Sequence, residues 1–262
     1  MKLKFYKYQG AGNDFVMVDD RENLFPIDHK TIETLCDRHF GIGADGLILL
    51  KKDETEAFKM VYFNSDGRES TMCGNGGRCI VQFAQDLGII QNETLFNAVD
   101  GLHRARVSGN LIELQMSNVS RVETYPTHLF LNTGSPHHVE FVQDVEQINV
   151  KLRGAEIRYG SPYFEKGSNV NFVQQLDGKT LKIRTYERGV EDETLACGTG
   201  ITAAAIASYD SGRIDSTEIV VLARGGELKV KFEQNPSGGY ENIWLVGPAK
   251  FVFEGEIDVP KN

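Results

Sequence analysis

The sequence has little of the material from which disulfide scaffolds, metal sites and membrane spans are built. Four cysteines in 262 residues are too few for a disulfide framework, and the Cys73 to Cys79 spacing lacks the second pair that a zinc site needs. No run approaches the roughly 18 apolar residues that cross a bilayer, and residues 1–8 alternate Lys with apolar residues, unlike a signal peptide. We therefore expect a soluble, cytoplasmic protein without a bound metal.

Positive charge is also in deficit. The chain has 28 Lys and Arg against 37 Asp and Glu, a net charge of −9, and its basic residues are scattered. A nucleic acid or an anionic membrane surface is therefore not an expected partner. With 40% apolar residues, the 262-residue chain can form one large domain or two of about 130 residues.

What the chain does contain is a repeated motif. Met72–Arg78 (MCGNGGR) and Ala196–Gly200 (ACGTG) each place a cysteine before Gly-x-Gly, and the cysteine positions, 73 and 197, differ by 124. A glutamate precedes each cysteine by four positions, as Glu69 and Glu193. The repeat predicts two similar domains and a last strand that returns to the first of them, at residues 1–120, 121–249 and 250–262.

Short-range patterns at the start of the chain predict a hairpin and a helix. Residues 3–8 and 15–18 read as strands on either side of a glycine-rich turn. Asp28 is placed as the N-cap of a helix that runs to about His39, with Gly41 as its stop signal.

Each cysteine motif opens a predicted helix. Apolar residues recur at helical spacing from Asn75 to Leu87, and Ile201–Ala207 is apolar nearly all round, as suits a helix enclosed by sheet. Short strands are expected at 47–50, 61–63, 95–99, 103–107, 111–116, 129–131, 139–142, 181–185, 219–222, 228–232, 243–246 and 250–253. The fold is thus predicted to be strand-rich α/β, with the two helices at domain centres.

The cysteine motifs suggest thiol chemistry beside a bound anion. Unpaired N–H groups at a helix N-terminus stabilise a thiolate and also bind a carboxylate. If the two sites faced one another, one thiolate would remove a proton from one face of a carbon and the other thiol would protonate the opposite face. This chemistry inverts a stereocentre and requires no redox cofactor.

Other local patterns have weaker implications. Gly41–Gly46 formally matches a dinucleotide-binding fingerprint, but a helix precedes it and a strand follows, so we interpret it as a turn. Pro136–His138 lacks the further ligands of a metal site. Glu187 and Arg188, ten and nine residues before the second cysteine, could present a carboxylate to an amine and a guanidinium to a carboxylate.

With these motifs assembled, the whole chain resembles the diaminopimelate epimerases. The resemblance rests on seven motifs in the family's order: Gly10–Phe15, Gly41–Asp45, Phe63–Gly67, Met72–Cys79, Asn169–Phe172, Glu187–Gly189 and Ala196–Gly200. It implies two similar domains, each a curled mixed or antiparallel sheet around a central helix, with the active site in the cleft between them. It also implies a cofactor-independent epimerase and a homodimer.

The resemblance matches Cys73 and Cys197 to two catalytic acid/base cysteines. Glu187 matches a group near the reacting amine and thiol, and His137 matches a histidine beside the catalytic pair. The residues implied to contact the substrate are Asn13, Gly74, Asn75, Gly198 and Thr199 at the reacting end, and Asn64, Asn169 and Arg188 at the far end. Three departures from the family pattern are Ser135, Gly46 and a loop at 189–193 that is about one residue longer.

Two alternatives remain open at this point. A proline or hydroxyproline epimerase would use the same cysteine motif, although a site built for a distal carboxylate and amine should reject monocarboxylic amino acids. A thiol redox module, in which Cys73 and Cys197 form a disulfide, would use facing thiols without catalysing epimerisation.

Overall fold

The computed structural model describes residues 1–259, which form two compact units. The first comprises residues 1–114 and the segment that begins at Pro248, and the second comprises residues 115–247. These limits fall a few residues before the boundaries expected at 120 and 249. The assignment of the units as functional domains stays a prediction.

The first unit contains two helices and a mixed sheet. Its helices are α1 (His29–Cys36) and α2 (Gly74–Asp86). Its strands are β1 (Lys2–Gly10), β2 (Asn13–Asp19), β3 (Gly46–Lys51), β4 (Lys59–Asn64), β5 (Glu69–Ser70), β6 (Glu93–Ala98), β7 (Gly101–Ser108), β8 (Leu111–Gln115) and β18 (Lys250–Asp258). The last of these pairs antiparallel with β1.

The second unit has a similar set of elements, with one additional short helix among the described residues. Its helices are the short 3₁₀ turn η1 (Val145–Gln147), α3 (Val150–Tyr159) and α4 (Gly198–Asp210). Its strands are β9 (Glu123–Thr124), β10 (Leu129–Asn132), β11 (Pro136–Phe141), β12 (Asn169–Gln175), β13 (Thr180–Glu187), β14 (Asp192–Thr194), β15 (Glu218–Ala223), β16 (Gly226–Gln234) and β17 (Tyr240–Pro248).

The pairing order of the two units is the same. In the first, β2 and β3 are parallel, β3 and β4 antiparallel, β4 and β6 parallel, and β6 and β7 antiparallel. In the second, the corresponding pairs β11–β12, β12–β13, β13–β15 and β15–β16 repeat this sequence. In both, the cysteine motif opens the helix that connects the last parallel pair. The internal repeat read from the cysteine motifs is therefore a repeat of topology.

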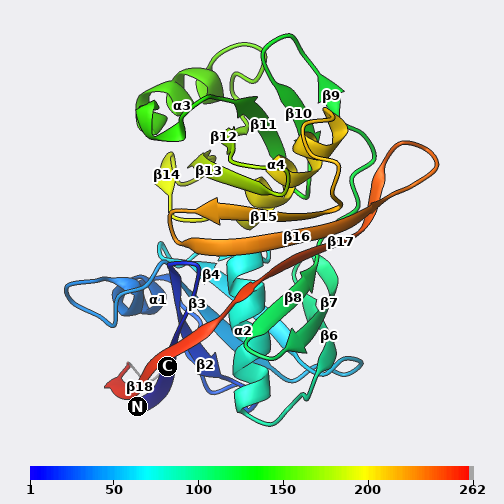
Figure 1. The fold of residues 1–262 in the computed structure, drawn as a ribbon. Coiled ribbons are helices and arrows are strands. Elements are labelled where there is room, and N and C mark those ends of the chain that lie inside the picture. Colours follow the sequence, from blue (N-terminus) through cyan, green and yellow to red (C-terminus); the bar gives the residue numbers. More distant parts are fainter. Residues whose placement is uncertain (260–262) are drawn as a thin grey trace. The chain divides into compact units, whose positions relative to one another are not determined.

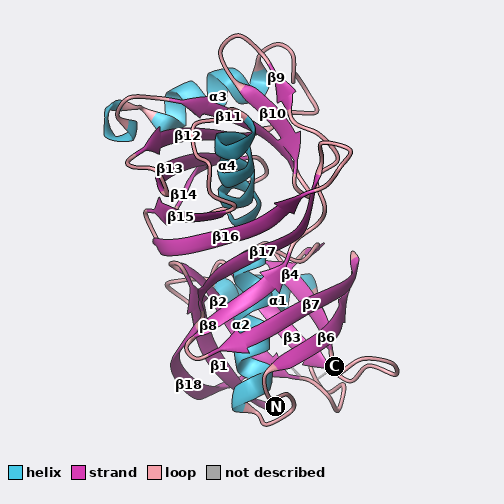
Figure 2. Cartoon of the chain, turned by 45° about the vertical axis from the view of Figure 1, so that its right-hand side comes forward, coloured by secondary structure: helices cyan, strands magenta, loops and turns pink. Residues whose placement is uncertain are grey.

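The two motif helices lie in the cores of their units. Figure 1 shows α2 in cyan beside β7 and β8, and Figure 2 shows strands of the second unit curving around α4. In α4, every residue from Gly200 to Ser208 is buried, as the all-round apolar pattern predicts. Because α4 touches β10, β11, β12, β13, β15 and β16, its backbone is held on several sides.

The predicted hairpin and N-cap are confirmed, but the end of the first helix is not. Asp28 accepts a hydrogen bond from the backbone of Thr31 and caps α1. The helix ends at Cys36, before the expected position at His39. Asp37 ends it, because its carboxylate accepts the backbone N–H groups of His39 and Phe40 and so turns the chain.

Two elements, α3 and β12, were not predicted from the sequence. The α3 segment has little apolar periodicity and carries Gly154 at its centre, which is unfavourable in a helix. The glycine is required by packing, since a Cβ at Gly154 would overlap the side chain of Tyr186 on β13. Tertiary contact therefore outweighs local helix propensity here.

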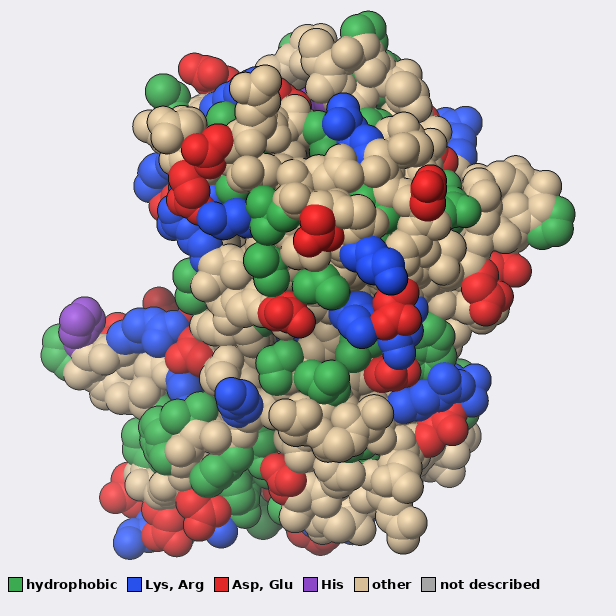
Figure 3. All heavy atoms as spheres, viewed as in Figure 1, with side chains coloured by type: hydrophobic (Ala, Val, Ile, Leu, Met, Phe, Trp, Pro, Cys, Tyr) green, Lys and Arg blue, Asp and Glu red, His purple; other side chains and the backbone are tan. Residues whose placement is uncertain are grey.

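Within residues 1–259, no helix is long and apolar enough to cross a membrane. On the face that Figure 3 shows, acidic and basic side chains are interspersed. In the same described residues, no three His, Cys, Asp or Glu side chains are grouped to hold a metal ion.

Candidate active site

Each motif cysteine occupies the N-cap position of its helix. Cys73 caps α2 and Cys197 caps α4, both with extended backbone (φ −102° and −110°). The sulfur of Cys73 accepts a hydrogen bond from the backbone N–H of Gly76 at 3.2 Å. A sulfur at this position lies beside the unpaired N–H groups and positive dipole end of the helix, which favour a thiolate.

The second glycine of each Gly-x-Gly makes room for the cysteine sulfur. A Cβ at Gly76 would lie 3.2 Å from the sulfur of Cys73, and one at Gly200 would lie 3.4 Å from that of Cys197. A Cβ at Gly200 would also overlap the side-chain oxygen of Asn171. A residue other than glycine at either position would therefore bring its Cβ against the cysteine sulfur.

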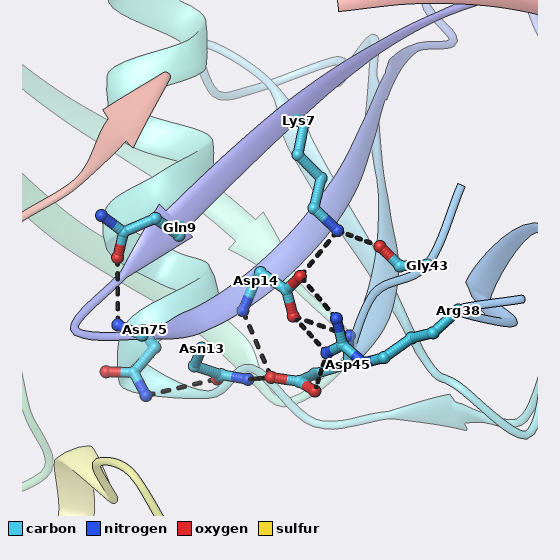
Figure 4. Close-up of polar contacts among 9 residues, drawn as sticks. Lys7, Gln9, Asn13, Asp14, Arg38, Gly43, Asp45 and Asn75 are labelled. Atoms are coloured by element: carbon cyan, nitrogen blue, oxygen red, sulfur yellow. Dashed lines mark hydrogen bonds and ion pairs between the residues drawn. The ribbon is translucent and has the colours of Figure 1, made fainter. Parts of the chain in front are cut away.

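In the first unit, a chain of amides leads away from the start of α2. Asn75 donates to the side-chain oxygen of Asn13 at 3.2 Å, and Asn13 donates to Asp45 at 2.6 Å (Figure 4). Arg78 donates to the oxygen of Asn75 at 3.0 Å. Because a guanidinium can only donate and a carboxylate can only accept, the two ends fix the orientation of both amides.

The two charged groups at the ends of this hydrogen-bonded series, Arg78 and Asp45, lie in different surroundings. Arg78 is fully buried, and burial lowers the pKa of its guanidinium to about 10, so it is still protonated at neutral pH. At the other end, Arg38 donates to Asp45 at 2.7 Å and also to Asp14, which pairs with buried Lys7 (Figure 4). Burial of Asp14 opposes its ionisation, but hydrogen bonds from Arg38 and Lys7 lower its pKa to about 2.

In the second unit, Asn171 connects His137 to the start of α4. Thr185 donates its hydroxyl to the oxygen of Asn171 at 3.0 Å, so the Asn171 nitrogen faces Nδ1 of His137 at 3.1 Å. Nδ1 is then the acceptor, and the neutral imidazole carries its proton on Nε2. Burial and the nearby charge of Arg188 lower the pKa of His137 to about 3, so the ring is neutral at physiological pH.

The Nε2 atom of His137 is a buried donor that has no hydrogen-bond partner among residues 1–259. An unpaired buried donor costs about 1–3 kcal/mol, and Nε2 of His138 likewise has no partner among the described residues. At the helix end, the hydroxyl of Thr199 lies 3.5 Å from the sulfur of Cys197, and Thr133 holds the Thr199 carbonyl at 2.9 Å.

The predicted residues Asn169, Glu187 and Arg188 lie where β12 begins and β13 ends. Asn169 accepts the backbone N–H of Arg188 at 2.9 Å and donates to the hydroxyl of Ser135 at 2.8 Å. Ser135, one of the departures from the family pattern, thus supports a predicted binding residue. Glu187 ends β13 and accepts the hydroxyl of Thr194 at 2.8 Å.

Gly46, the second departure, has no room for a side chain. It lies opposite Asn64 in the β3–β4 pair. A Cβ there would approach the Phe63 carbonyl to 2.5 Å and the Tyr62 ring to 2.6 Å. Asn64 itself ends β4 and is exposed, at the same end of the sheet as Asn13 on β2.

Within each unit the structure groups residues that the sequence predicted and adds others that it missed. Asn13 and Asn75 are joined around α2, and His137, Thr199, Cys197 and Asn171 gather around α4. The supporting residues that sequence reasoning missed are Asp14, Arg38, Asp45, Arg78, Asn171 and Thr185. For Asn171 a signal existed, since residues two apart on a strand share a face and Asn169 was already a candidate.

Comparison with known proteins identifies a family. A family model described as diaminopimelate epimerase matches residues 5–121 and 129–252. A curated diaminopimelate epimerase from Flavobacterium psychrophilum is 56% identical over 257 residues, covering 97% of this chain and 100% of that protein. One from Aquifex aeolicus is 41% identical over 276 residues, covering 97% and 98%.

Solved structures with similar folds are more distant in sequence. A phenazine biosynthesis protein of the PhzF family from Bacillus anthracis has a TM-score of 0.76 at 14% identity and covers 99% of this chain and 100% of its own. A hydroxyproline epimerase from Agrobacterium vitis has a TM-score of 0.68 at 12% identity, with 98% and 92% coverage. This likeness confirms the mixed, strand-rich α/β fold and shows the fold alone.

Proposed function

We propose, from the premise that this chain belongs to the diaminopimelate epimerase family, that Cys73 and Cys197 exchange the α-proton of the substrate. The chain is an isomerase of lysine biosynthesis that interconverts LL- and meso-2,6-diaminopimelate. The observation that carries the proposal for the cysteines is their equivalent placement, each as the N-cap of a core helix in a repeated topology.

In the proposed mechanism, one cysteine is a thiolate and the other a thiol. The thiolate removes the α-proton from one face, and the thiol delivers its own proton to the opposite face, so the stereocentre inverts and the two sulfurs exchange protonation states. The direction of the reaction decides which cysteine starts deprotonated. The two units would act as domains that enclose the substrate between these sulfurs.

The helix ends would stabilise the charge that develops on the reacting carboxylate. Gly74 and Asn75 contribute backbone N–H groups at the start of α2, and Gly198 and Thr199 contribute those at the start of α4. Fixed donors of this kind need no reorganisation during the reaction. Asn13, held by Asp45, would contact the substrate at the same end.

His137 and Glu187 would act beside the thiols. The neutral His137 ring offers its unpaired Nε2–H as a donor near the start of α4, and it cannot act as a strong acid or base at neutral pH. Glu187 would bind the reacting amine. At the far end of the substrate, Asn64, Asn169 and Arg188 would bind the second amino acid centre, with the guanidinium of Arg188 facing its carboxylate.

The alternatives are less well supported. The hydroxyproline epimerase is similar to this chain only in fold, at 12% identity, whereas the diaminopimelate epimerases match along nearly its whole length. A redox module would not need Asn169, Arg188 and their supports. We expect oxidation to inactivate the enzyme reversibly if the two thiols come together.

The test is single substitution of each cysteine. Cys73→Ala and Cys197→Ala should each reduce kcat by roughly 10²–10⁴-fold, the usual contribution of a general acid or base, while binding of diaminopimelate persists. Cys36→Ala is the control, because Cys36 is buried and burial raises its thiol pKa to about 12. Normal turnover in either motif variant would refute the two-thiol mechanism.

The proposal extends to location and assembly. The low cysteine content, four in 262 residues, is too small for the disulfide framework of many secreted proteins and supports a cytoplasmic location. A homodimer follows from the family resemblance, and light scattering of the purified protein would test it.

A further inference from the structure

Arg158 and Glu191 form an ion pair in the second unit, apart from the residues assigned to substrate binding or proton transfer. Arg158 lies in the last turn of α3 with its side chain 11% exposed, and the side chain of Glu191 is 32% exposed. Nη2 and Nε of Arg158 lie 3.1 and 3.3 Å from the same carboxylate oxygen of Glu191. The pair is thus more enclosed than a surface salt bridge.

The backbone of Glu191 has φ +60°, in the left-handed region that favours glycine. A residue other than glycine persists there when its surroundings hold it in place. Besides Arg158, the Glu191 carboxylate accepts the hydroxyl of Tyr186 at 3.2 Å and the backbone N–H of Gly189 at 3.1 Å. Glu191 belongs to the longer loop at 189–193, so the structure gives this loop a specific set of contacts.

The guanidinium of Arg158 also holds a second segment. Its Nη1 donates to the carbonyl of Phe164 at 3.3 Å. A Cβ at Gly167 would overlap this guanidinium, so the glycine, at φ +61°, lets the chain pass directly against it. Arg158 therefore ties residues 160–167 to residues 188–191.

Arg188 follows β13 and is also hydrogen-bonded to residues at 166 and 169. Its backbone N–H donates to Asn169 at 2.9 Å, and its guanidinium donates to the carbonyl of Lys166 at 3.0 Å. A shift of either segment would move the Arg188 side chain relative to Asn169. We propose that Arg158 and Glu191 are positioning residues that hold Arg188 and Asn169 for recognition of the distal amino acid centre, an inference that rests on the proposed function.

The test uses two variants of Glu191. Glu191→Gly removes the carboxylate and suits the left-handed backbone, so it should fold, whereas Glu191→Gln keeps the shape and removes the charge. Because the distal end is chemically unchanged in the reaction, each should raise KM for LL-diaminopimelate about 10-fold with kcat within about 2-fold of wild type. In an Arg188→Lys background, Glu191→Gln should change KM by less than about 2-fold, because both act through the same side chain.

The matched control is Glu140→Gln. Glu140 on β11 forms an ion pair with Arg153, which lies on α3 like Arg158. The Glu140 side chain is 14% exposed, but this pair holds neither of the two loop segments. The control should leave KM unchanged. Hydrogen exchange gives a readout that does not depend on activity: the backbone N–H groups of Arg188 and Gly189 should exchange faster in Glu191→Gln and at the wild-type rate in Glu140→Gln.

The outcomes separate the two claims. If wild-type protein epimerises diaminopimelate but the Glu191 variants match the control in KM, or if their effect is undiminished in the Arg188→Lys background, the positioning role is wrong. If folded wild-type protein has no activity, the proposed function fails. Unchanged hydrogen exchange at Arg188 and Gly189 in Glu191→Gln would then overturn the positioning role independently of activity.

Discussion

Replacement of Gly200 by alanine should damage catalysis far more than stability. The added Cβ would overlap the side-chain oxygen of Asn171 and lie 3.4 Å from the sulfur of Cys197. Asn171 cannot easily yield, because Thr185 holds its oxygen at 3.0 Å and its nitrogen donates to His137 and to the His138 carbonyl.

The expected size of each effect follows from this geometry. Alanine gains about 1 kcal/mol of helix propensity over glycine, and overpacking costs about 1–3 kcal/mol, so the net loss is about 0–2 kcal/mol. At about 2–4 °C per kcal/mol, the melting temperature should fall by no more than about 8 °C. A displacement of Asn171 by about 1 Å, which moves the His137 ring, should reduce kcat/KM about 100-fold.

The assay compares initial rates of epimerisation and thermal unfolding for three variants. Gly239→Ala is the control for strain away from the site, because its Cβ would meet the carbonyls of Val119 and Ser120 at 2.8 and 2.9 Å. Gly178→Ala, with open space around the new Cβ, is the neutral control. Wild-type kcat/KM in Gly200→Ala would refute the assigned role of Asn171 and His137.

Three other predictions concern supporting residues. Asp45→Asn removes the carboxylate that orients Asn13 and should lower kcat/KM about 10-fold in steady-state assays, with little change in melting temperature because Asp45 is 43% exposed. Gly46→Ala should lower the free energy of unfolding by about 1–3 kcal/mol in urea titrations, because its Cβ would approach a carbonyl to 2.5 Å. Burial lowers the pKa of His138 to about 3, whereas the unfolded chain has a histidine pKa of about 6.5. Between these values the unfolded state binds one more proton than the native state, so the free energy of unfolding falls as pH decreases. His138→Gln should reduce this slope by about 1.4 kcal/mol per pH unit in denaturation measured at pH 4–6.

Much of the fold was predictable because its signals are local. Alternating residues and a two-residue turn, with Ala11 and Gly12 at positive φ, define the first hairpin. Asp28 marks the start of α1, and the all-round apolar run in α4 marks a helix enclosed by sheet.

The missed elements depend on contacts between distant segments. The helix α3 has a glycine at its centre that only the packing of Tyr186 explains. The early end of α1 has a local cause instead, since the Asp37 carboxylate accepts the backbone N–H groups of His39 and Phe40.

The candidate site shows the same division. The motifs predicted both cysteines, and the structure places them at helix N-caps as expected. The partners that orient Asn13 and His137 come from other segments of the chain, and of these only Asn171 had a signal in the sequence, its spacing of two from Asn169. Their roles in catalysis stay predictions, whereas the assignment to the diaminopimelate epimerases is confirmed by the relatives.

The most direct test of two-thiol proton exchange is epimerisation in deuterated water. Reduced protein, free of added metal and cofactor, would be incubated with LL-diaminopimelate, and the isomers would be separated and analysed by mass spectrometry. Two-thiol exchange should give meso product with one deuterium at the inverted carbon, because the donating thiol carries solvent-derived hydrogen. Meso product without deuterium, formed by fully exchanged enzyme, would contradict it.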